Sequence, residues 1–282
     1  GGPTAVEAGG GRAAPLSSPR PLASCGVALG DAEPGDCPGH GRPFVAGRPS
    51  RQLHVASPAR PDALGLDGSR APASLRNGRP FSKLGLRSDL VSGVYSFGFE
   101  FSTAIQEVVL GHAIQYVDVE CIAAPGTGRT SALVMGCLLH VDVNSLNCQA
   151  VMLEPTREKA QQCGALVQAL GARMGVRCLH LRGSEHAGNW HRLSGQLQLL
   201  VGTPVCVHDL VCSAAIGLGG VNVLGLDGAD EMLARGQRHL ILAIQKALPE
   251  DTQVLLFAAA APPDLVELAS EVLWDPARVG EA

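Results

Sequence analysis

Two acidic residues follow an apolar run in the last quarter of the chain. Residues 221–226 have the composition of a buried strand, and Asp227 and Asp230 come directly after it, at the start of an amphipathic segment. Enzymes that hydrolyse nucleoside triphosphates place carboxylates at a strand end in this way, because the carboxylates bind the Mg²⁺ that accompanies the phosphates. The pattern predicts a metal-binding site at this point.

A glycine-rich turn at residues 123–130 could bind the phosphates themselves. Gly126 and Gly128 allow the tight turn that directs backbone N–H groups at phosphate oxygens, and the helix predicted to begin here adds positive potential. Thr130 is placed to bind Mg²⁺. Arg129 stands where the standard loop has lysine, so the charge is kept on a wider, planar group. Taken alone, the turn fits a strand-to-helix connection without a ligand equally well.

The elements that must position these residues alternate along the chain. Apolar runs alternate with segments of helical period, which predicts an α/β fold with a mostly parallel sheet, the three-layer RecA-like domain of P-loop NTPases. Glu120 interrupts the strand before the glycine-rich turn and is expected to weaken the sheet. The predicted strands are residues 117–123, 148–153, 176–181, 197–202, 221–226 and 253–258, and the clearest predicted helices are residues 130–140, 156–174, 230–248 and 262–273.

Composition divides the chain into two parts. Residues 1–80 are rich in Gly, Pro, Ala, Ser and Arg and show no helical or strand period, which predicts a disordered segment before a folded domain at residues 81–282. The first part carries a net charge of +3 and the second −7, which argues against a broad phosphate-binding surface on the folded domain. The scattered arginines are typical of a solvated tail, with attraction of nucleic acid or an acidic partner as the alternative.

Bulk properties set limits on the class of protein. The 282 residues are 46% hydrophobic, which is enough for a sizeable core. There is no apolar run of about 18 residues and no compact apolar signal segment at the start, so we expect no membrane contact and a cytoplasmic location, with the nucleus as the alternative. Nine cysteines without a Cys-x-x-Cys pair fit reduced thiols better than disulfides or a zinc site.

Further motifs occur in order around the two candidate sites. Residues 98–106 read Gly-Phe-Glu-Phe-Ser-Thr-Ala-Ile-Gln, residues 155–160 Pro-Thr-Arg-Glu-Lys-Ala, and residues 202–204 Gly-Thr-Pro. With the glycine-rich turn and the acidic residues at 227–230, they resemble the amino-terminal RecA-like domain of DEAD-box RNA helicases, and in particular the translation initiation factor 4A group of that family. The resemblance spans residues 81 to about 279.

The resemblance implies ATP and Mg²⁺ as cofactors and assigns roles to individual residues. Gln106 would read the adenine edge, and Phe81 would stack on the base, with a core anchor as the alternative role for Phe81. Asp230 would bond toward a Ser-Ala-Thr motif that is Ala-Ala-Ala at residues 258–260, so helix capping becomes the expected role of Asp230. The implied nucleotide contacts are Phe81, Thr103, Gln106, Pro125, Gly126, Thr127, Gly128, Arg129 and Thr130, and the implied Mg²⁺ contacts are Thr130 and Asp227, the latter through water.

The resemblance also implies an RNA-binding surface. Val205 and Cys206 stand where the family has Gly-Arg, which removes one charged phosphate contact, so we expect weak RNA binding without base preference. Translation-initiation scaffold proteins are the class of partner implied. The positions that match contacts to the sugar-phosphate backbone are Thr156, Arg157, Gly183 and Thr203.

Two departures from the family predict that catalysis is lost. Gly228 replaces the glutamate that positions and deprotonates the attacking water, and losing a general base costs about 10²- to 10⁴-fold in rate. The sequence ends near Ala282, where the second RecA-like domain would begin, so we expect the arginines of that domain to be missing. Three functions stay open: a nucleotide- or RNA-binding pseudoenzyme, a decayed domain with no selected ligand, and an active ATP-dependent RNA helicase.

Overall fold

The computed structural model describes Gly1 and residues 78–181, 197–214 and 216–280. Within these ranges strands and helices alternate, as the sequence periods predict. The strands are β1 (Val119–Ile122), β2 (Ala150–Leu153), β3 (Cys178–His180), β4 (Leu199–Gly202), β5 (Val223–Asp227), β6 (Gln253–Ala258) and β7 (Ala277–Gly280). The helices are α1 (Ser88–Phe97), α2 (Ala104–Ala113), α3 (Arg129–Leu139), α4 (Arg157–Leu170), α5 (Pro204–Cys212), α6 (Ala229–Ala234), α7 (Arg238–Ala247) and α8 (Pro263–Val272), with a 3-10 turn at Phe81–Lys83.

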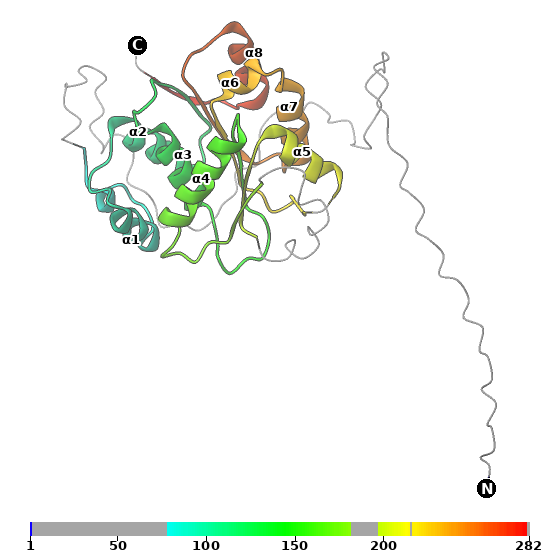
Figure 1. Ribbon diagram of the computed structural model, residues 1–282. Helices are drawn as coiled ribbons and strands as arrows, with labels where there is room; N and C mark the ends of the chain where they lie inside the picture. The colour runs from blue at the N-terminus through cyan, green and yellow to red at the C-terminus, as the bar shows by residue number, and fades with distance from the viewer. Residues whose placement is uncertain (2–77, 182–196, 215, 281–282) are drawn as a thin grey trace. The chain divides into compact units, whose positions relative to one another are not determined.

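The strands form one parallel sheet between two layers of helices. Their spatial order is β3-β4-β2-β5-β6-β1-β7. Helices α1 to α4 pack in one apolar core and α5 to α8 in a second, on opposite faces of the sheet (Figure 1). The inner strands are buried on both faces, which is why they appear in the sequence as continuous apolar runs. The predicted three-layer α/β architecture is therefore confirmed.

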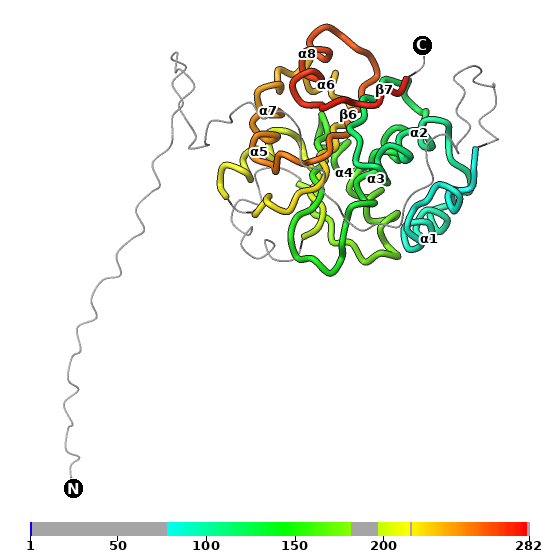
Figure 2. Tube along the Cα trace, turned by 180° about the vertical axis from the view of Figure 1, so that it is seen from behind, coloured from blue at the N-terminus to red at the C-terminus, as the bar shows by residue number. Residues whose placement is uncertain are grey.

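The predicted elements differ from the observed ones at a few positions. All six predicted strands are present, and β6 has the predicted bounds. The single helix predicted at residues 230–248 is two helices, because the chain turns at Gly236, which has a φ of +71°. Strand β7 was not predicted, since it has only four residues and its burial alternates at the sheet edge; Figure 2 shows the connection from α8 to it.

Residues 79 and 80, beside the predicted domain boundary, contact the segment that includes α2. Of the predicted disordered segment, residues 1–80, only Gly1 and residues 78–80 are described. Pro80 forms an antiparallel bridge with Phe101, and the backbone N–H of Arg79 donates to Glu107 Oε1 at 2.7 Å. No helix in the described ranges is long and apolar enough to cross a membrane.

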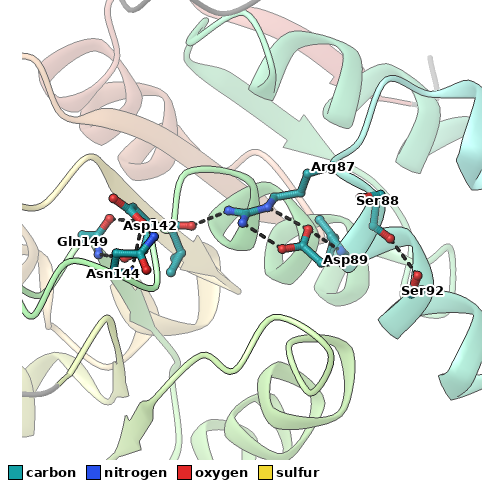
Figure 3. Close-up of polar contacts among 9 residues, drawn as sticks. Arg87, Ser88, Asp89, Ser92, Asp142, Asn144 and Gln149 are labelled. Atoms are coloured by element: carbon teal, nitrogen blue, oxygen red, sulfur yellow. Dashed lines mark hydrogen bonds and ion pairs between the residues drawn. The ribbon is translucent and has the colours of Figure 1, made fainter.

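The segment before α2 is fixed to the rest of the helix layer by polar contacts (Figure 3). Arg87 holds Asp89 through two hydrogen bonds of 2.8 Å and donates from Nη1 to the carbonyl of Val141 at 2.5 Å. Burial raises the pKa of Asp89, but the hydrogen bonds and charge of Arg87 outweigh it and leave that pKa below its ordinary value. Gly93 of α1 approaches the Leu170 carbonyl so closely that a Cβ there would lie 1.9 Å from the oxygen. These contacts hold α1 against α4 and against the segment that follows α3.

The sequence predicts that Glu120 weakens the sheet, and the structure shows that its carboxylate has a partner on the neighbouring strand. Glu120 lies in β1, only 8% exposed, opposite Arg278 of β7. Arg278 Nε donates to Glu120 Oε2 at 3.0 Å. Because β7 was not predicted, Arg278 could not be recognised from sequence as the partner of Glu120.

We expect Arg278→Ala to lower the free energy of unfolding by about 1 kcal/mol. The change leaves the carboxylate of Glu120 without this partner, but the Arg278 side chain is 81% exposed, so solvent screens much of the interaction. Urea unfolding of the full chain measures the difference. Arg235→Ala, at an exposed arginine following α6, is the control and should change the value by less than about 0.5 kcal/mol. Equal values for the two variants would contradict this account of Glu120.

Candidate nucleotide-binding site

The glycine-rich turn has the geometry of an anion-binding loop. It connects β1 to α3, and Gly126 and Gly128 have φ values of +86° and +90°, a region that favours glycine. Gly128 is the N-cap of α3, and no side chain caps the helix, so its first N–H groups are free of side-chain acceptors. Thr127 Oγ1 donates to the carbonyl of Ala124 at 2.8 Å and tightens the turn. A helix amino terminus of this kind attracts phosphate.

Thr130 and Asp227, the two implied Mg²⁺ contacts, meet at the base of this loop. Thr130 Oγ1 donates to Asp227 Oδ2 at 2.5 Å, although 97 positions separate the two residues in the sequence. Asp227 is 8% exposed, and burial raises its pKa, while the Thr130 hydrogen bond and the charge of Arg129 act in the opposite direction. A carboxylate and a hydroxyl are the hard oxygen ligands that suit Mg²⁺.

The side chain of Arg129 supplies a positive charge that the protein does not fully satisfy. Its Nη1 atom is buried and has no hydrogen-bond partner among the described residues. An unsatisfied buried donor in the first turn of α3 fits a phosphate oxygen. No group of three His, Cys, Asp or Glu residues in the described ranges could hold a metal, so a cation beside Asp227 needs further oxygens, which phosphates supply.

Asp230 does not cap a helix, contrary to the prediction. The N-cap of α6 is Gly228, with φ +71° and ψ 46°, because the chain turns sharply at the end of β5 and Asp230 falls inside the first helical turn. Asp230 Oδ2 instead accepts from the backbone N–H of Ala259 at 3.3 Å. Asp230 thus contacts the Ala-Ala-Ala segment through a backbone N–H group. This contact does not need the serine and threonine hydroxyls that the Ser-Ala-Thr motif would supply.

Gln106 and Thr103 pack against the phosphate loop from α2. Thr103 is the N-cap of α2 and forms a reciprocal capping box with Gln106. Thr103 Oγ1 donates to the carbonyl of Thr127 at 3.0 Å, and Gln106 Nε2 donates to Ser131 Oγ at 2.8 Å. The structure therefore brings both residues to the loop, with their polar groups bonded within the protein.

Phe81 lies inside the core. Its side chain is 0% exposed, and its ring packs against Phe99 at a centroid distance of 6.4 Å. In this arrangement the ring has no free face for a base, so the alternative role, a core anchor, fits the structure. Pro125 lies in the loop between β1 and α3 and is exposed.

The described RNA-binding candidates lie beyond the carboxyl ends of β2 and β4, which are neighbours in the sheet. Thr156 caps α4 by accepting from the N–H of Lys159 at 3.2 Å, and exposed Arg157 is the first residue of that helix. Thr203 caps α5. The fourth candidate, Gly183, lies outside the described residues.

Sequence reasoning missed three charged residues around Gly228. Glu154 follows β2, next to the end of β5 in the parallel register, and is 2% exposed with no hydrogen-bond partner for Oε1 among the described residues. Burial, together with the charge of Asp227, raises the pKa of Glu154 to about 8. Lys159 of α4 forms an ion pair with Glu231 of α6. Glu154 could have been noticed from sequence, because it is a charged residue directly after the apolar run of β2.

Comparison with known proteins agrees with this geometry. The sequence model of the DEAD/DEAH box helicase family matches residues 103–268. ATP-dependent RNA helicase eIF4A of Pyricularia oryzae and of Coccidioides immitis are 37% and 38% identical to the chain over 200 residues, which is 71% of this chain and 50% of each relative. The chain thus spans about half the length of these relatives.

Solved structures show the same RecA-like fold. A DEAD box protein from Methanococcus jannaschii superposes with a TM-score of 0.67 at 25% identity, over 72% of this chain and 56% of that one. S. cerevisiae Dbp5 bound to RNA and ADP BeF3 gives a TM-score of 0.64 at 27% identity, over 73% of this chain and 52% of that one.

Proposed function

Because the chain belongs to the DEAD/DEAH box helicase family, we propose that its folded domain binds ATP with Mg²⁺ and the backbone of RNA, and hydrolyses ATP no faster than background. The observation that carries the binding half is the contact of Thr130 with Asp227 beneath a left-handed glycine loop. The observation that carries the other half is Gly228, which places no side chain beside that contact.

The binding site is built from groups that recognise phosphate. The N–H groups at the start of α3 and the guanidinium of Arg129 would hold the phosphates, and Thr130 and Asp227 would hold Mg²⁺. Mg²⁺, when bound, neutralises charge on the phosphates. The hydroxyl of Thr130 and the carboxylate of Asp227 are already in contact, so the two proposed Mg²⁺ ligands lie at one place.

Hydrolysis needs a group that positions and deprotonates water, and position 228 cannot supply it. A Cβ added to Gly228 would lie 3.3 Å from Pro155 Cγ and 3.9 Å from Glu231 Cδ. The neighbouring carboxylate, Glu231, is held in its ion pair with Lys159. Glu154 is buried with a pKa raised to about 8 by burial and by Asp227, so it is protonated at neutral pH and is a poor base there.

RNA contact and cellular role follow as weaker parts of the same proposal. Arg157 is exposed beyond the carboxyl end of β2, and Thr156 and Thr203 lie beyond the carboxyl ends of β2 and β4. Contacts from such residues to the sugar-phosphate backbone of RNA carry no base preference. The relatives are named as ATP-dependent RNA helicases eIF4A. A cytoplasmic location and translation-initiation scaffold proteins as the partner class belong to this proposal as expectations from the sequence resemblance.

Calorimetric titration of Mg–ATP into the full chain tests the binding half. We expect saturable binding, and Arg129→Ala should weaken it by about 10- to 100-fold, the loss of one charged hydrogen bond. Arg173→Ala, at an exposed arginine after α4, is the matched control and should leave the affinity unchanged. No heat of binding with the folded wild-type chain would contradict the proposal.

A further inference from the structure

We propose that Lys159 binds the terminal phosphate of the nucleotide, and that this contact lets the site distinguish a triphosphate from a diphosphate. The inference rests on the proposed function, because it adds a phosphate contact to the same site. Lys159 is the third residue of α4, so its positive charge comes from outside the turn between β1 and α3.

Lys159 lies next to the acidic end of β5. Strand β2 is the neighbour of β5 in the sheet and α4 follows β2, so the first turn of α4 reaches the carboxyl edge where Asp227 stands. Burial raises the pKa of Asp227, and the hydrogen bond from Thr130 opposes this effect. The positive charges of Arg129 and Lys159 also act to lower that pKa. The proposed Mg²⁺ ligand is therefore within electrostatic reach of one cation from α3 and another from α4.

The space beside Lys159 is narrow and has no side chain at position 228. A Cβ on Gly228 would lie 3.3 Å from Pro155 Cγ and 3.9 Å from Glu231 Cδ. Lys159 forms its ion pair with Glu231, so the ammonium adjoins this space. Because the walls are so close, the end of the triphosphate that carries no sugar is the end that the space admits.

The ammonium of Lys159 keeps donors for a ligand. One of its three N–H groups donates to Glu231 Oε1, and within the described parts of the chain no other acceptor lies at hydrogen-bond distance. Both side chains of the pair are 44% exposed, so solvent screens the attraction between them. Lys159 can therefore donate to a phosphate oxygen while it keeps Glu231. Glu231 then stays paired, as the proposed lack of hydrolysis requires.

The two cations of the site would serve different phosphates. Arg129 and the first N–H groups of α3 belong to the turn that follows β1, and they would hold the phosphates nearer the sugar. Lys159 would hold the last phosphate, on the side of Asp227 that faces α4. A diphosphate lacks that group, so Lys159 should contribute little to its affinity.

Calorimetric titration of the full chain with two ligands tests this. One is Mg–ADP, and the other is the Mg²⁺ complex of β,γ-imido-ATP, an analogue that keeps three phosphates and resists hydrolysis. Lys159→Gln should weaken the triphosphate by about 10-fold, the loss of one charge-assisted hydrogen bond, and change the affinity for ADP by less than about twofold. Lys159→Arg keeps the charge and should recover most of the loss. Lys246→Gln, at an exposed lysine of α7, is the matched control and should change neither affinity.

The outcomes separate the inference from the proposed function. An equal loss for both ligands in Lys159→Gln would show that the residue only supports the structure of the site, and an unchanged affinity for the triphosphate would show that it makes no contact. Either result overturns the inference, and binding of the triphosphate by the wild-type chain leaves the proposed function intact. If the folded wild-type chain binds neither ligand, the proposed function fails and the inference fails with it.

Lysine acetylation gives a second readout, on the wild-type chain, if Lys159→Gln does not fold. The other lysines of the sequence, Lys83 and Lys246, are both exposed and serve as internal references. The chain is treated with acetic anhydride in the presence of saturating ligand, and mass spectrometry of its peptides measures the acetylation of each lysine. We expect the triphosphate analogue to slow acetylation of Lys159, and ADP to leave it unchanged. Equal protection by the two ligands, or protection by neither, would overturn the inference.

Discussion

The full chain is expected to show no RNA-stimulated ATP hydrolysis above background, and Gly228→Glu should raise its turnover by up to about 10²-fold. The reason is that a general base contributes about 10²- to 10⁴-fold, and Gly228 is the position beside the Thr130–Asp227 contact that lacks one. The backbone φ of +71° at this position makes a glutamate there strained by about 1 kcal/mol, a small penalty beside that gain.

Gly228→Gln is the matched control, because glutamine has the shape of glutamate and cannot take a proton. Phosphate release with and without single-stranded RNA measures all three proteins, and the control should stay at the wild-type value. RNA-stimulated turnover in the wild-type chain that disappears with Asp227→Ala would show that catalysis does not need a side chain at position 228.

Glu154 is expected to make the protein less stable as the pH rises from about 4.5 to 8. Burial and the charge of Asp227 raise the pKa of Glu154 from 4.5 to about 8 in the folded chain. Below the unfolded value both states are protonated and the group costs nothing; above it the unfolded chain ionises while the folded chain holds the proton. The free energy of unfolding therefore falls progressively as the pH rises from the pKa of Glu154 in the unfolded chain through its pKa in the folded chain.

The size of this effect can be measured by unfolding at two pH values. At about 1.4 kcal/mol per pH unit, Glu154 should remove on the order of 3 kcal/mol of unfolding free energy between pH 4.5 and 7. Glu154→Gln should raise stability at pH 7 by about 1 to 3 kcal/mol and flatten the pH dependence, since the buried amide still lacks a full set of partners. Glu100→Gln, at an exposed glutamate, is the control. A stability at pH 7 that Glu154→Gln leaves unchanged or lowers would contradict the buried, protonated carboxyl.

The backbone of the site could be predicted from sequence because it depends on local patterns. The apolar runs locate six strands, and glycine at positions 126 and 128 locates the turn with left-handed φ values. The pairing of Thr130 with Asp227 also follows, because a phosphate loop and an acidic strand end meet at the same edge of a parallel sheet.

The remaining features depend on three-dimensional packing that no local pattern carries. Arg278, the partner of Glu120, lies in an edge strand of four residues, Ala277–Gly280, which has no continuous apolar run. The orientation of Gln106 is decided by its contact with Ser131, 25 positions away. Asp230 was predicted to cap a helix, but the N-cap of α6 is Gly228, two residues earlier. The reason is the sharp turn of the chain at the end of β5.

Identifying the nucleotide that stays bound to the protein distinguishes binding without hydrolysis from turnover. The full chain is incubated with Mg–ATP and single-stranded RNA, separated rapidly from free nucleotide, and denatured, and the released nucleotide is analysed by chromatography. We expect ATP on the protein at every time point, with Arg129→Ala retaining little of it. Accumulation of bound ADP on the wild-type chain, faster than in a protein-free control, would contradict it.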